Sequence, residues 1–379
     1  NAANFTKSAD YRALARVLGR GLLTSEGDFW QRQRGLIQPA FHKQNIQAYA
    51  AVMTGAAERM LNSWNDGGER NLHEDMMRVT LEIVAQCLYG AEVSSEAERV
   101  GRAMEVVTEG FVTSASLALL FSFDIPLFFA RAERRAVRHL NEIIGGIIQE
   151  RRTSNRRRED LLDMLLRARD ADGKPMSDVQ LRDEVMTLIL AGHETTALAL
   201  SWTWYLLAQH PEAEAELLAE LQTALGGRAP TVADLPRLQY TEAVVKESMR
   251  LYPPAWATSR RAVHDSEIGG YSIPAGAELL LCQWVVQRDP RYYDDPEAFM
   301  PCRWQDEAIK RLPKYAYFPF GGGPRLCIGN SFAMMEAVLL LASMAQKFHC
   351  ALVPGHPVIP WPSITLRPKH GIKMVVSRR

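Results

Sequence analysis

The 379-residue sequence has no excess of charge of either sign, since 44 Lys and Arg residues are balanced by 44 Asp and Glu residues. Such a chain has no general attraction to nucleic acid or to anionic membranes, so we expect no nucleic-acid partner. It has no apolar run long enough to span a bilayer and no signal peptide at its start, which predicts a cytoplasmic protein. Because the chain begins at Asn1 rather than Met, we expect an upstream segment, and a membrane anchor within it stays open.

Cysteine is scarce and scattered. The five cysteines include no C-x-x-C pair, and Cys302 and Cys350 are far in sequence from Cys327, which argues against a structural zinc site. This spacing favours a reducing compartment over a disulfide framework. No low-complexity linker divides the chain, so we expect residues 1–379 to form a single domain.

Cys327 ends a glycine-rich stretch, FGGGPRLCIG at 320–329, which is followed at once by an apolar helical pattern over 331–340. Consecutive glycines let the backbone approach a flat group closely. The start of a helix favours a thiolate over a thiol. Taken alone, the stretch fits a buried structural cysteine and an axial thiolate on haem iron equally well.

A second polar stretch, AGHETT at 191–196, interrupts a long apolar helical pattern. Glu194 is costly to bury there, and Thr195 is a poor helix former. We expect the Thr195 hydroxyl to bond to the Ala191 carbonyl, with Gly192 permitting the local opening of the helix. The resulting notch would suit the binding and protonation of dioxygen. Alternatively, a hydroxyl in the middle of a helix can have no further role than its hydrogen bond to the backbone of that helix.

These motifs together resemble the cytochrome P450 family. The 320–329 stretch is similar to its haem-binding motif, and 191–196 matches its oxygen-activation motif, with Glu194 as the acid and Thr195 as the alcohol. The resemblance covers nearly the whole chain and implies haem b with Cys327 as the axial thiolate. It further implies a set of cofactor-binding residues, namely Trp30, Arg34, Arg260, Phe320, Arg325, Cys327 and Gly329.

The resemblance also gives meaning to a weak pattern, Glu247-x-x-Arg250 on a predicted helix over 240–250. On its own such a pair usually lies on the protein surface and contributes little to stability. In the family it joins a later arginine, here Arg303, in a buried ionic triad. Cys302 stands where the family usually has a glutamate. We interpret the triad as structural, because it would lock the segment that leads to the cysteine loop.

The implied fold is mainly α, with a large helical domain and small peripheral β-sheets, although the family's N-terminal sheet and helix segment is missing before the Tyr11 region. The implied activity is insertion of one oxygen atom from O₂ into a C–H bond of a small apolar substrate. No flavin or ferredoxin motif is present, so a separate ferredoxin and ferredoxin reductase, or a flavodoxin-type donor, would supply electrons. We expect a monomer.

Within the family, YRAL at 11–14, GRGLLT at 19–24 and RLYPPAW at 250–256 look similar to a bacterial carotenoid hydroxylase. The apolar stretch 110–130, read either as core or as a lid over the substrate, contains no Arg, Lys or His. Because an unpaired buried carboxylate is costly, this favours an uncharged carotenoid or terpenoid. A fatty-acid hydroxylase or peroxygenase of the same fold is the alternative, and a non-catalytic haem sensor is a remote one.

Overall fold

The computed structural model describes residues 2–90, 100–103, 106–107, 131–154, 160–169 and 173–379; the predicted lid at 110–130 lies outside this part. The chain divides into unit 1 (Asn1–Ala40, Val84–Ala191 and Ala257–Leu281) and unit 2 (Phe41–Ile83, Gly192–Trp256 and Cys282–Arg379). The expected architecture, mainly helical with small sheets, is confirmed. That the whole chain is a single domain stays a prediction.

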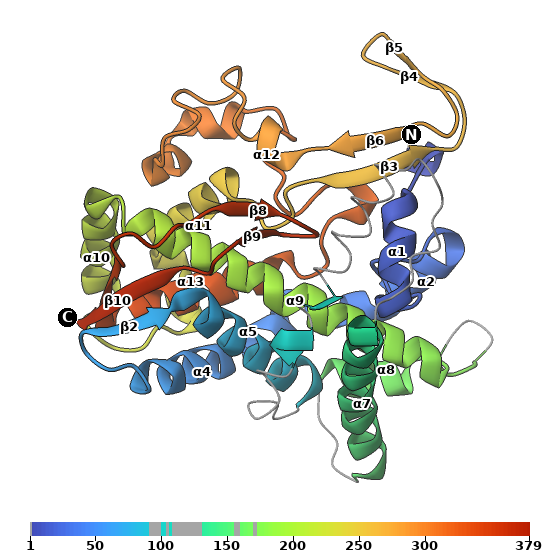
Figure 1. Cartoon of the computed structure of the whole chain (residues 1–379), viewed down its shortest axis with the longest axis horizontal. Helices are drawn as coiled ribbons and strands as arrows, with labels where there is room; N and C mark the ends of the chain where they lie inside the picture. The colour runs from blue at the N-terminus through green and yellow to red at the C-terminus, as the bar shows by residue number, and fades with distance from the viewer. Residues whose placement is uncertain (1, 91–99, 104–105, 108–130, 155–159, 170–172) are drawn as a thin grey trace. The chain divides into compact units, whose positions relative to one another are not determined.

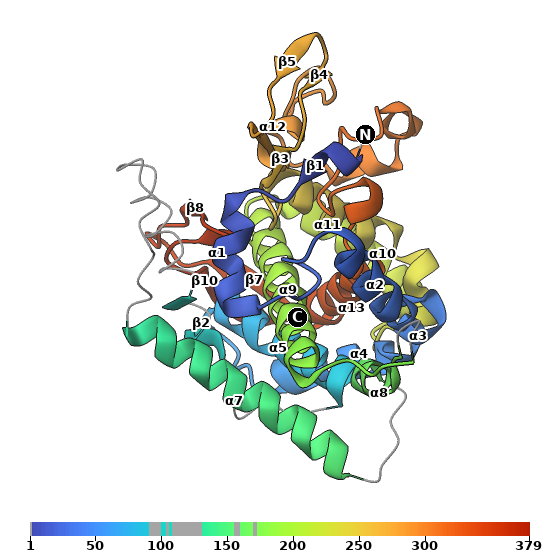
Figure 2. The same cartoon turned by 90° about the vertical axis from the view of Figure 1, so that its right-hand side faces the viewer.

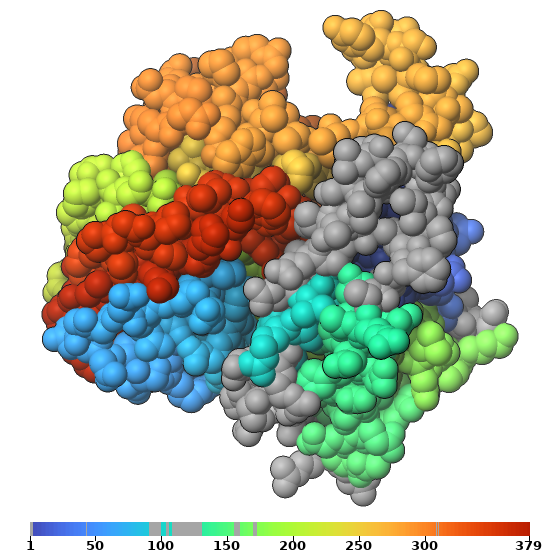
Figure 3. Space-filling view, in the orientation of Figure 1, coloured from blue at the N-terminus to red at the C-terminus, as the bar shows by residue number. Residues whose placement is uncertain are grey.

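Unit 1 contains helices and a small antiparallel sheet (Figure 1). Its helices are α1 (Ala9–Leu18), α2 (Gly27–Ile37), α7 (Arg131–Thr153), α8 (Leu161–Arg167) and the first part of α9 (Asp178–Leu207). Its sheet has the order β1 (Phe5–Thr6), β3 (Thr258–Ala262) and β6 (Glu278–Leu281), and β4 (Ser266–Ile268) pairs with β5 (Tyr271–Ile273). This β4–β5 hairpin projects beyond β3 and β6 (Figure 1) and forms the yellow-orange projection in the space-filling view (Figure 3).

Glu184, on the first part of α9, forms hydrogen bonds that hold the N-terminal segment of unit 1 against this helix. Its fully buried carboxyl accepts hydrogen bonds from the Leu22 backbone N–H at 2.8 Å and from Gln33 Nε2 at 3.0 Å. Burial raises the pKa of Glu184 from 4.5 to about 7, against the opposing effect of these two donors. Near neutral pH, the Glu184 carboxyl is therefore protonated in a substantial fraction of the molecules.

This raised pKa predicts a stability that depends on pH. The folded protein holds the Glu184 proton more tightly than the unfolded chain, so its contribution is fully present below pH 4.5 and is lost as the pH rises through about 7. The difference in pKa corresponds to about 3 kcal/mol. We expect Glu184→Gln to flatten the unfolding free energy, measured by urea titration, between pH 5 and pH 8. Glu142→Gln, at an exposed position on α7, is the control, and a Glu184→Gln profile equal to wild type would contradict this prediction.

Unit 2 holds the remaining elements. Its helices are α3 (Lys43–Ala48), α4 (Ala50–Asn62), most of α5 (Leu72–Tyr89), the second part of α9, α10 (Pro211–Leu225), α11 (Gln239–Leu251), α12 (Gln283–Val286) and α13 (Asn330–Lys347). Its strands are β2 (Gly68–Asn71), β7 (Phe348–Leu352), β8 (Pro360–Pro362), β9 (Leu366–Pro368) and β10 (Lys373–Arg378). Short 3-10 helices are η1 (Ala2–Asn4) in unit 1, η2 (Gln38–Phe41) at the boundary, and η3 (Val232–Arg237), η4 (Pro301–Gln305), η5 (Glu307–Arg311) and η6 (Gly323–Arg325) in unit 2.

Helix α13 is the centre of unit 2. Every residue from Met335 to Ala345 is buried, and the helix packs against α4, α10 and α11 (Figure 2). An α-helix buried on all sides has no polar face, which explains the continuous apolar sequence that follows the cysteine loop. The core thus fixes the helix that begins just after Cys327.

A three-stranded antiparallel sheet with the order β2-β10-β7 completes unit 2. Val375 of β10 lies opposite Glu69 of β2 and Ala351 of β7, so the last strand joins two segments that are far apart in sequence. The smaller β8–β9 hairpin is tied to the helical core, because Trp202 Nε1 on α9 donates to the Leu366 carbonyl at 2.9 Å. This hairpin brings Arg367 of β9 towards α9.

Candidate active site

A closed backbone turn presents Cys327. Its backbone N–H donates to the Phe320 carbonyl at 2.9 Å. Gly321 and Gly323 have φ angles of 71° and 63°, in the left-handed region that favours glycine. Because α13 begins at Asn330, the thiol lies near the positive end of a helix, where a thiolate is stabilised.

The surroundings of this thiol fit a flat apolar cofactor. The Cys327 side chain is exposed, and its neighbour Leu326 keeps 36% of its surface exposed. A Cβ added to Gly322 would lie 2.4 Å from the Tyr315 ring, so the loop packs too closely against this ring for any side chain at position 322. Cys350, by contrast, is buried, and burial raises the pKa of its thiol. The donor type, the exposure and the apolar flank suit haem iron.

Glu194 and Thr195 of the predicted notch lie in the part of α9 that belongs to unit 2. Glu194 is buried, whereas Thr195 beside it keeps part of its surface exposed. Thr196 Oγ1 donates to the Gly192 carbonyl at 3.2 Å, which is the back-bonding that opens a helix locally. The predicted bond from Thr195 to Ala191 stays a prediction, since Ala191 belongs to unit 1.

Two residues that the sequence did not reveal hold the Glu194 carboxylate. Thr365 Oγ1 donates to Glu194 Oε1 at 2.5 Å, and Arg367 Nε donates to the same oxygen at 2.7 Å. Burial raises the pKa of Glu194, but Arg367, Thr365 and His193 together outweigh it, so this pKa lies below its usual value. Glu194 is therefore an ionised carboxylate inside an apolar helix. The cost of burying a glutamate signals that a partner exists, but nothing local identifies one 173 residues later.

The structure brings the three residues of the predicted triad together. Arg250 donates from Nε to Glu247 Oε2 at 2.9 Å and from an Nη to Oε1 at 2.8 Å, and Arg303 Nε donates to Oε1 at 2.9 Å. The same carboxylate accepts bonds from Trp304 Nε1 at 2.8 Å and from the Met300 N–H at 3.0 Å. The side chains of Glu247 and Arg250 are fully buried.

Arg250 extends this network to the backbone of the segment before the cysteine loop. Its Nη atoms donate to the carbonyls of Gln287, Pro296 and Ala298 at 2.9, 2.6 and 2.9 Å. Arg250, a single buried residue of α11, therefore holds the backbone of an irregular segment at three positions. Within unit 2, this arrangement is one of several that hold the irregular segment over 287–304, since Gln287 Nε2 also donates to the Met249 carbonyl at 3.0 Å.

Three predicted cofactor-binding residues belong to unit 1. Trp30 is buried on α2 with Arg34 half-buried one turn later, and Arg260 on β3 donates to the Ser259 carbonyl at 2.7 Å. Burial raises the pKa of Tyr11, and the positive charge of Arg260 partly opposes this effect. The proposed place of these residues at the haem propionates stays a prediction.

The other cofactor-binding predictions lie in unit 2. Arg325 ends η6 and is half-buried. Gly329 precedes α13, and a Cβ there would lie 3.7 Å from the Phe41 ring, which is ordinary van der Waals contact. Among the residues that the structure describes, no cluster of three His, Cys, Asp or Glu side chains could hold a metal ion.

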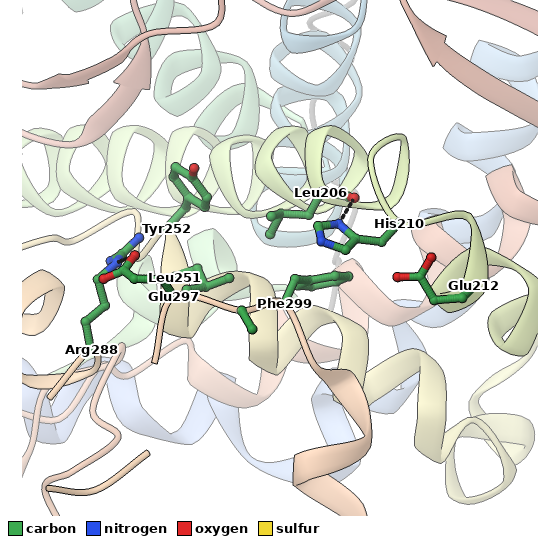
Figure 4. A pocket seen from close by; sticks show the side chains of 9 residues that line it. Leu206, His210, Glu212, Leu251, Tyr252, Arg288, Glu297 and Phe299 are labelled. Carbon is green, nitrogen blue, oxygen red and sulfur yellow. Dashed lines mark hydrogen bonds and ion pairs between the residues drawn. The ribbon is translucent and has the colours of Figure 1, made fainter. Parts of the chain in front are cut away.

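A surface cavity of about 340 Å³ lies elsewhere in unit 2 (Figure 4). It is lined at one end by Leu206 and His210 and at the other by Tyr252 and by Arg288, which pairs with Glu297 at 3.1 Å. None of the predicted site residues lines it. We therefore do not assign this cavity to the substrate.

Known proteins identify the family of this chain. A model of the cytochrome P450 family matches residues 1–375. Cyclooctatin synthase of Streptomyces melanosporofaciens is 38% identical over 353 residues, which cover 92% of this chain and 77% of that protein. Cyclooctat-9-en-7-ol 5-monooxygenase of the same organism is 34% identical over 353 residues (93% and 77%). Pentalenene oxygenase of Streptomyces avermitilis is 34% identical over 358 residues (94% and 80%).

These matches confirm the predicted family and the predicted fold. The narrower similarity to a carotenoid hydroxylase stays a prediction, since these relatives are named for other compounds. No helix in the described part of the chain is long and apolar enough to cross a membrane. Family membership implies a haem with a cysteine thiolate ligand, together with a need for O₂ and for redox partners. The chain belongs to the cytochrome P450 family and is a monooxygenase.

Proposed function

We propose that Cys327 is the axial haem ligand and that Glu194 and Thr195 deliver protons to the oxygen site. The haem supplies the oxidative chemistry, in which one atom of O₂ enters a C–H bond of the substrate and the other leaves as water. The observation that carries this proposal is the buried, ionised Glu194 beside the half-exposed Thr195 hydroxyl. A haem sensor would need the cysteine but not this pair.

The hydrogen bonds of Glu194 suggest how a proton moves. Thr365 and Arg367 both bind Oε1, and in the described part of the chain no hydrogen bond reaches Oε2. We propose that Oε2 is the atom that accepts a proton and passes it towards Thr195 Oγ1. Arg367 orients the carboxylate and keeps it ionised, so the relay begins from a defined state.

Replacing Thr195 by alanine tests this relay. Thr195→Ala should still bind haem and substrate, but we expect the product formed per reductant consumed to fall by at least about tenfold, with peroxide released instead. Thr195→Ser keeps the hydroxyl and is the matched control. Unchanged coupling in Thr195→Ala would remove Thr195 from the mechanism.

We propose an uncharged terpenoid as the substrate. Carotenoids, which are long polyenes, are included in this class. Two relatives carry the names cyclooctat-9-en-7-ol 5-monooxygenase and pentalenene oxygenase, which are names of terpenoid chemistry. The segment Pro253–Trp256 contains no charged residue, and the backbone bond from Leu366 N–H to Pro254 O (2.9 Å) fixes it in place. Electrons would come from a separate ferredoxin system or a flavodoxin-type donor, and we propose a monomer.

Substrate binding can be compared with the haem spin state as the readout. A terpene hydrocarbon, a carotenoid, a fatty acid and its methyl ester are titrated into the holoenzyme. We expect the uncharged ligands to shift the spin state and the free acid to bind at least about tenfold more weakly than its ester, because the stretches 110–130 and Pro253–Trp256 contain no Arg, Lys or His to pair its carboxylate. Tight binding of the acid but not of the ester would point to fatty-acid hydroxylation instead.

A further inference from the structure

Within unit 2, helix α5 contacts the backbone of α9 directly beside the notch (Figure 1). Thr80 Oγ1 lies 3.0 Å from the carbonyl oxygen of His193, the residue that precedes Glu194. Thr80 is completely buried, and His193 keeps only 1% of its surface exposed. The proton relay proposed above does not use Thr80.

The Thr80 hydroxyl has one hydrogen and two close carbonyl acceptors. Its oxygen lies 2.9 Å from the Met76 carbonyl, one turn earlier on α5, and 3.0 Å from the His193 carbonyl, whereas the Met77 carbonyl is farther away at 3.4 Å. The contact with Met76 follows from the side-chain conformation of a threonine in a helix, so α5 forms it by itself. The contact with His193 has no such local cause, because α9 is a separate helix that could lie farther away.

The separation of the two helices shows where the hydrogen of Thr80 points. Two oxygens that face each other with lone pairs only repel each other, and a buried site has no bulk water to weaken this repulsion. A distance of 3.0 Å between Thr80 Oγ1 and the His193 oxygen is therefore stable only if the hydrogen lies between them or is shared with Met76. Thr80 thus donates a hydrogen bond from α5 to the backbone of α9.

A second polar contact joins the same two helices about two turns away. His73 Nδ1 on α5 lies 3.2 Å from Ser201 Oγ on α9. Ser201 donates its own hydrogen to the Ala197 carbonyl at 2.6 Å, so the Nδ1–H of His73 is the donor in this contact. One contact sets a distance between two helices, whereas two contacts also set their axial positions. The pair at Thr80 and His193 is therefore held in register.

We propose that Thr80 is a positioning residue for the proton relay. Its hydroxyl holds the peptide group between His193 and Glu194, from which the Glu194 side chain extends. Thr365 and Arg367 hold the other end of that side chain at Oε1. With its backbone and one carboxyl oxygen both fixed, Glu194 presents Oε2 in a single orientation. This role rests on the proposed function of Glu194, whereas the bond between the two helices does not.

Crystal structures of the Thr80 variants of the holoenzyme test the bond itself. Valine has the shape of threonine, but it places a methyl group where the hydroxyl was, and a carbon atom contacts a carbonyl oxygen at about 3.3–3.6 Å. We expect Thr80→Val to move the His193 carbonyl away from residue 80 to at least about 3.3 Å. Thr80→Ser should keep the separation of the wild-type protein. An unchanged separation in Thr80→Val would show that no hydrogen bond holds the helices together at this point.

The product formed per reductant consumed tests the positioning role. In Thr80→Val we expect this coupling to fall by about fivefold, the effect of losing one ordinary hydrogen bond, with unchanged substrate affinity in the spin-state titration. Thr80→Ser should restore the coupling. Thr203→Val is the matched control, because Thr203 is also completely buried and donates to the Ala199 carbonyl on its own helix at 2.7 Å. Both valine variants should lower the urea midpoint, but only Thr80→Val should lower the coupling.

Three results would overturn the positioning role. The first is wild-type coupling in Thr80→Val, and the second is a failure of Thr80→Ser to restore coupling. The third is an equal loss of coupling in Thr203→Val, since a general loosening of the core would then explain both variants. If Thr80→Val does not fold, Thr80→Ala takes its place, because it removes the hydroxyl without adding a methyl group next to the carbonyl, and the same loss of coupling is expected.

The two hypotheses fail in different ways. If the proposed function is wrong, the wild-type protein itself shows neither a thiolate-type ferrous–CO spectrum nor coupled turnover, while Thr80→Val still displaces the His193 carbonyl. If the role of Thr80 is wrong, the wild-type spectrum and turnover are normal, and turnover stays coupled in Thr80→Val.

Discussion

Glu247→Ala is expected to give protein that is poorly folded or free of haem. The substitution removes the acceptor of five donors and leaves Arg250, whose side chain is fully buried, without its counter-charge. Removing one partner of such a buried pair costs about 3–5 kcal/mol, which is a large share of the stability of an ordinary protein. Soluble yield, haem content and the urea midpoint measure the effect.

The same helix offers a matched control. Glu242 pairs with Lys246 at 2.7 Å, but 43% and 35% of these side chains are exposed, so Glu242→Ala should change the free energy of unfolding by less than about 1 kcal/mol. Glu247→Gln keeps the volume and some acceptor capacity, and we expect it to fall between the two. Normal yield and haem content in Glu247→Ala would mean that the triad is not needed for folding.

The sequence predicted those parts of the candidate site whose residues are close together along the chain. The glycine-rich loop, the Glu194–Thr195 pair and the Glu247–Arg250 pair each occupy one turn or one loop, so spacing alone brings their members together. Arg303 came from the family resemblance and lies where that resemblance puts it, at 2.9 Å from Glu247. The long helix around the notch also followed from its apolar pattern, since α9 runs from Asp178 to Leu207.

What the sequence did not reveal depends on tertiary pairing. Arg367 reaches Glu194 only because β8 and β9 fold back towards α9, and no periodicity in either segment signals this. Strand β2 has the sequence GERN, which has little β-propensity and forms a strand because β10 pairs with it. Glu336 is different, because this lone acid in the apolar run over 332–345 is visible in the sequence, whereas its complete burial is shown only by the structure.

The second large effect is expected at Cys327. Cys327→His replaces a thiolate with a neutral imidazole, which cannot push electron density towards O–O cleavage. We expect monooxygenase turnover to fall below detection, even where the variant still binds haem. Cys302→Ser is the matched control because Cys302 is likewise exposed, yet it lies in η4 and not in the glycine loop.

The absorption spectrum of the ferrous–CO complex tests the central claim most directly. We expect wild-type protein and Cys302→Ser to show the red-shifted band of a thiolate-ligated haem, and Cys327→His to lose it. A Cys327→His protein that retains the red-shifted band would contradict the assignment of Cys327 as the axial ligand.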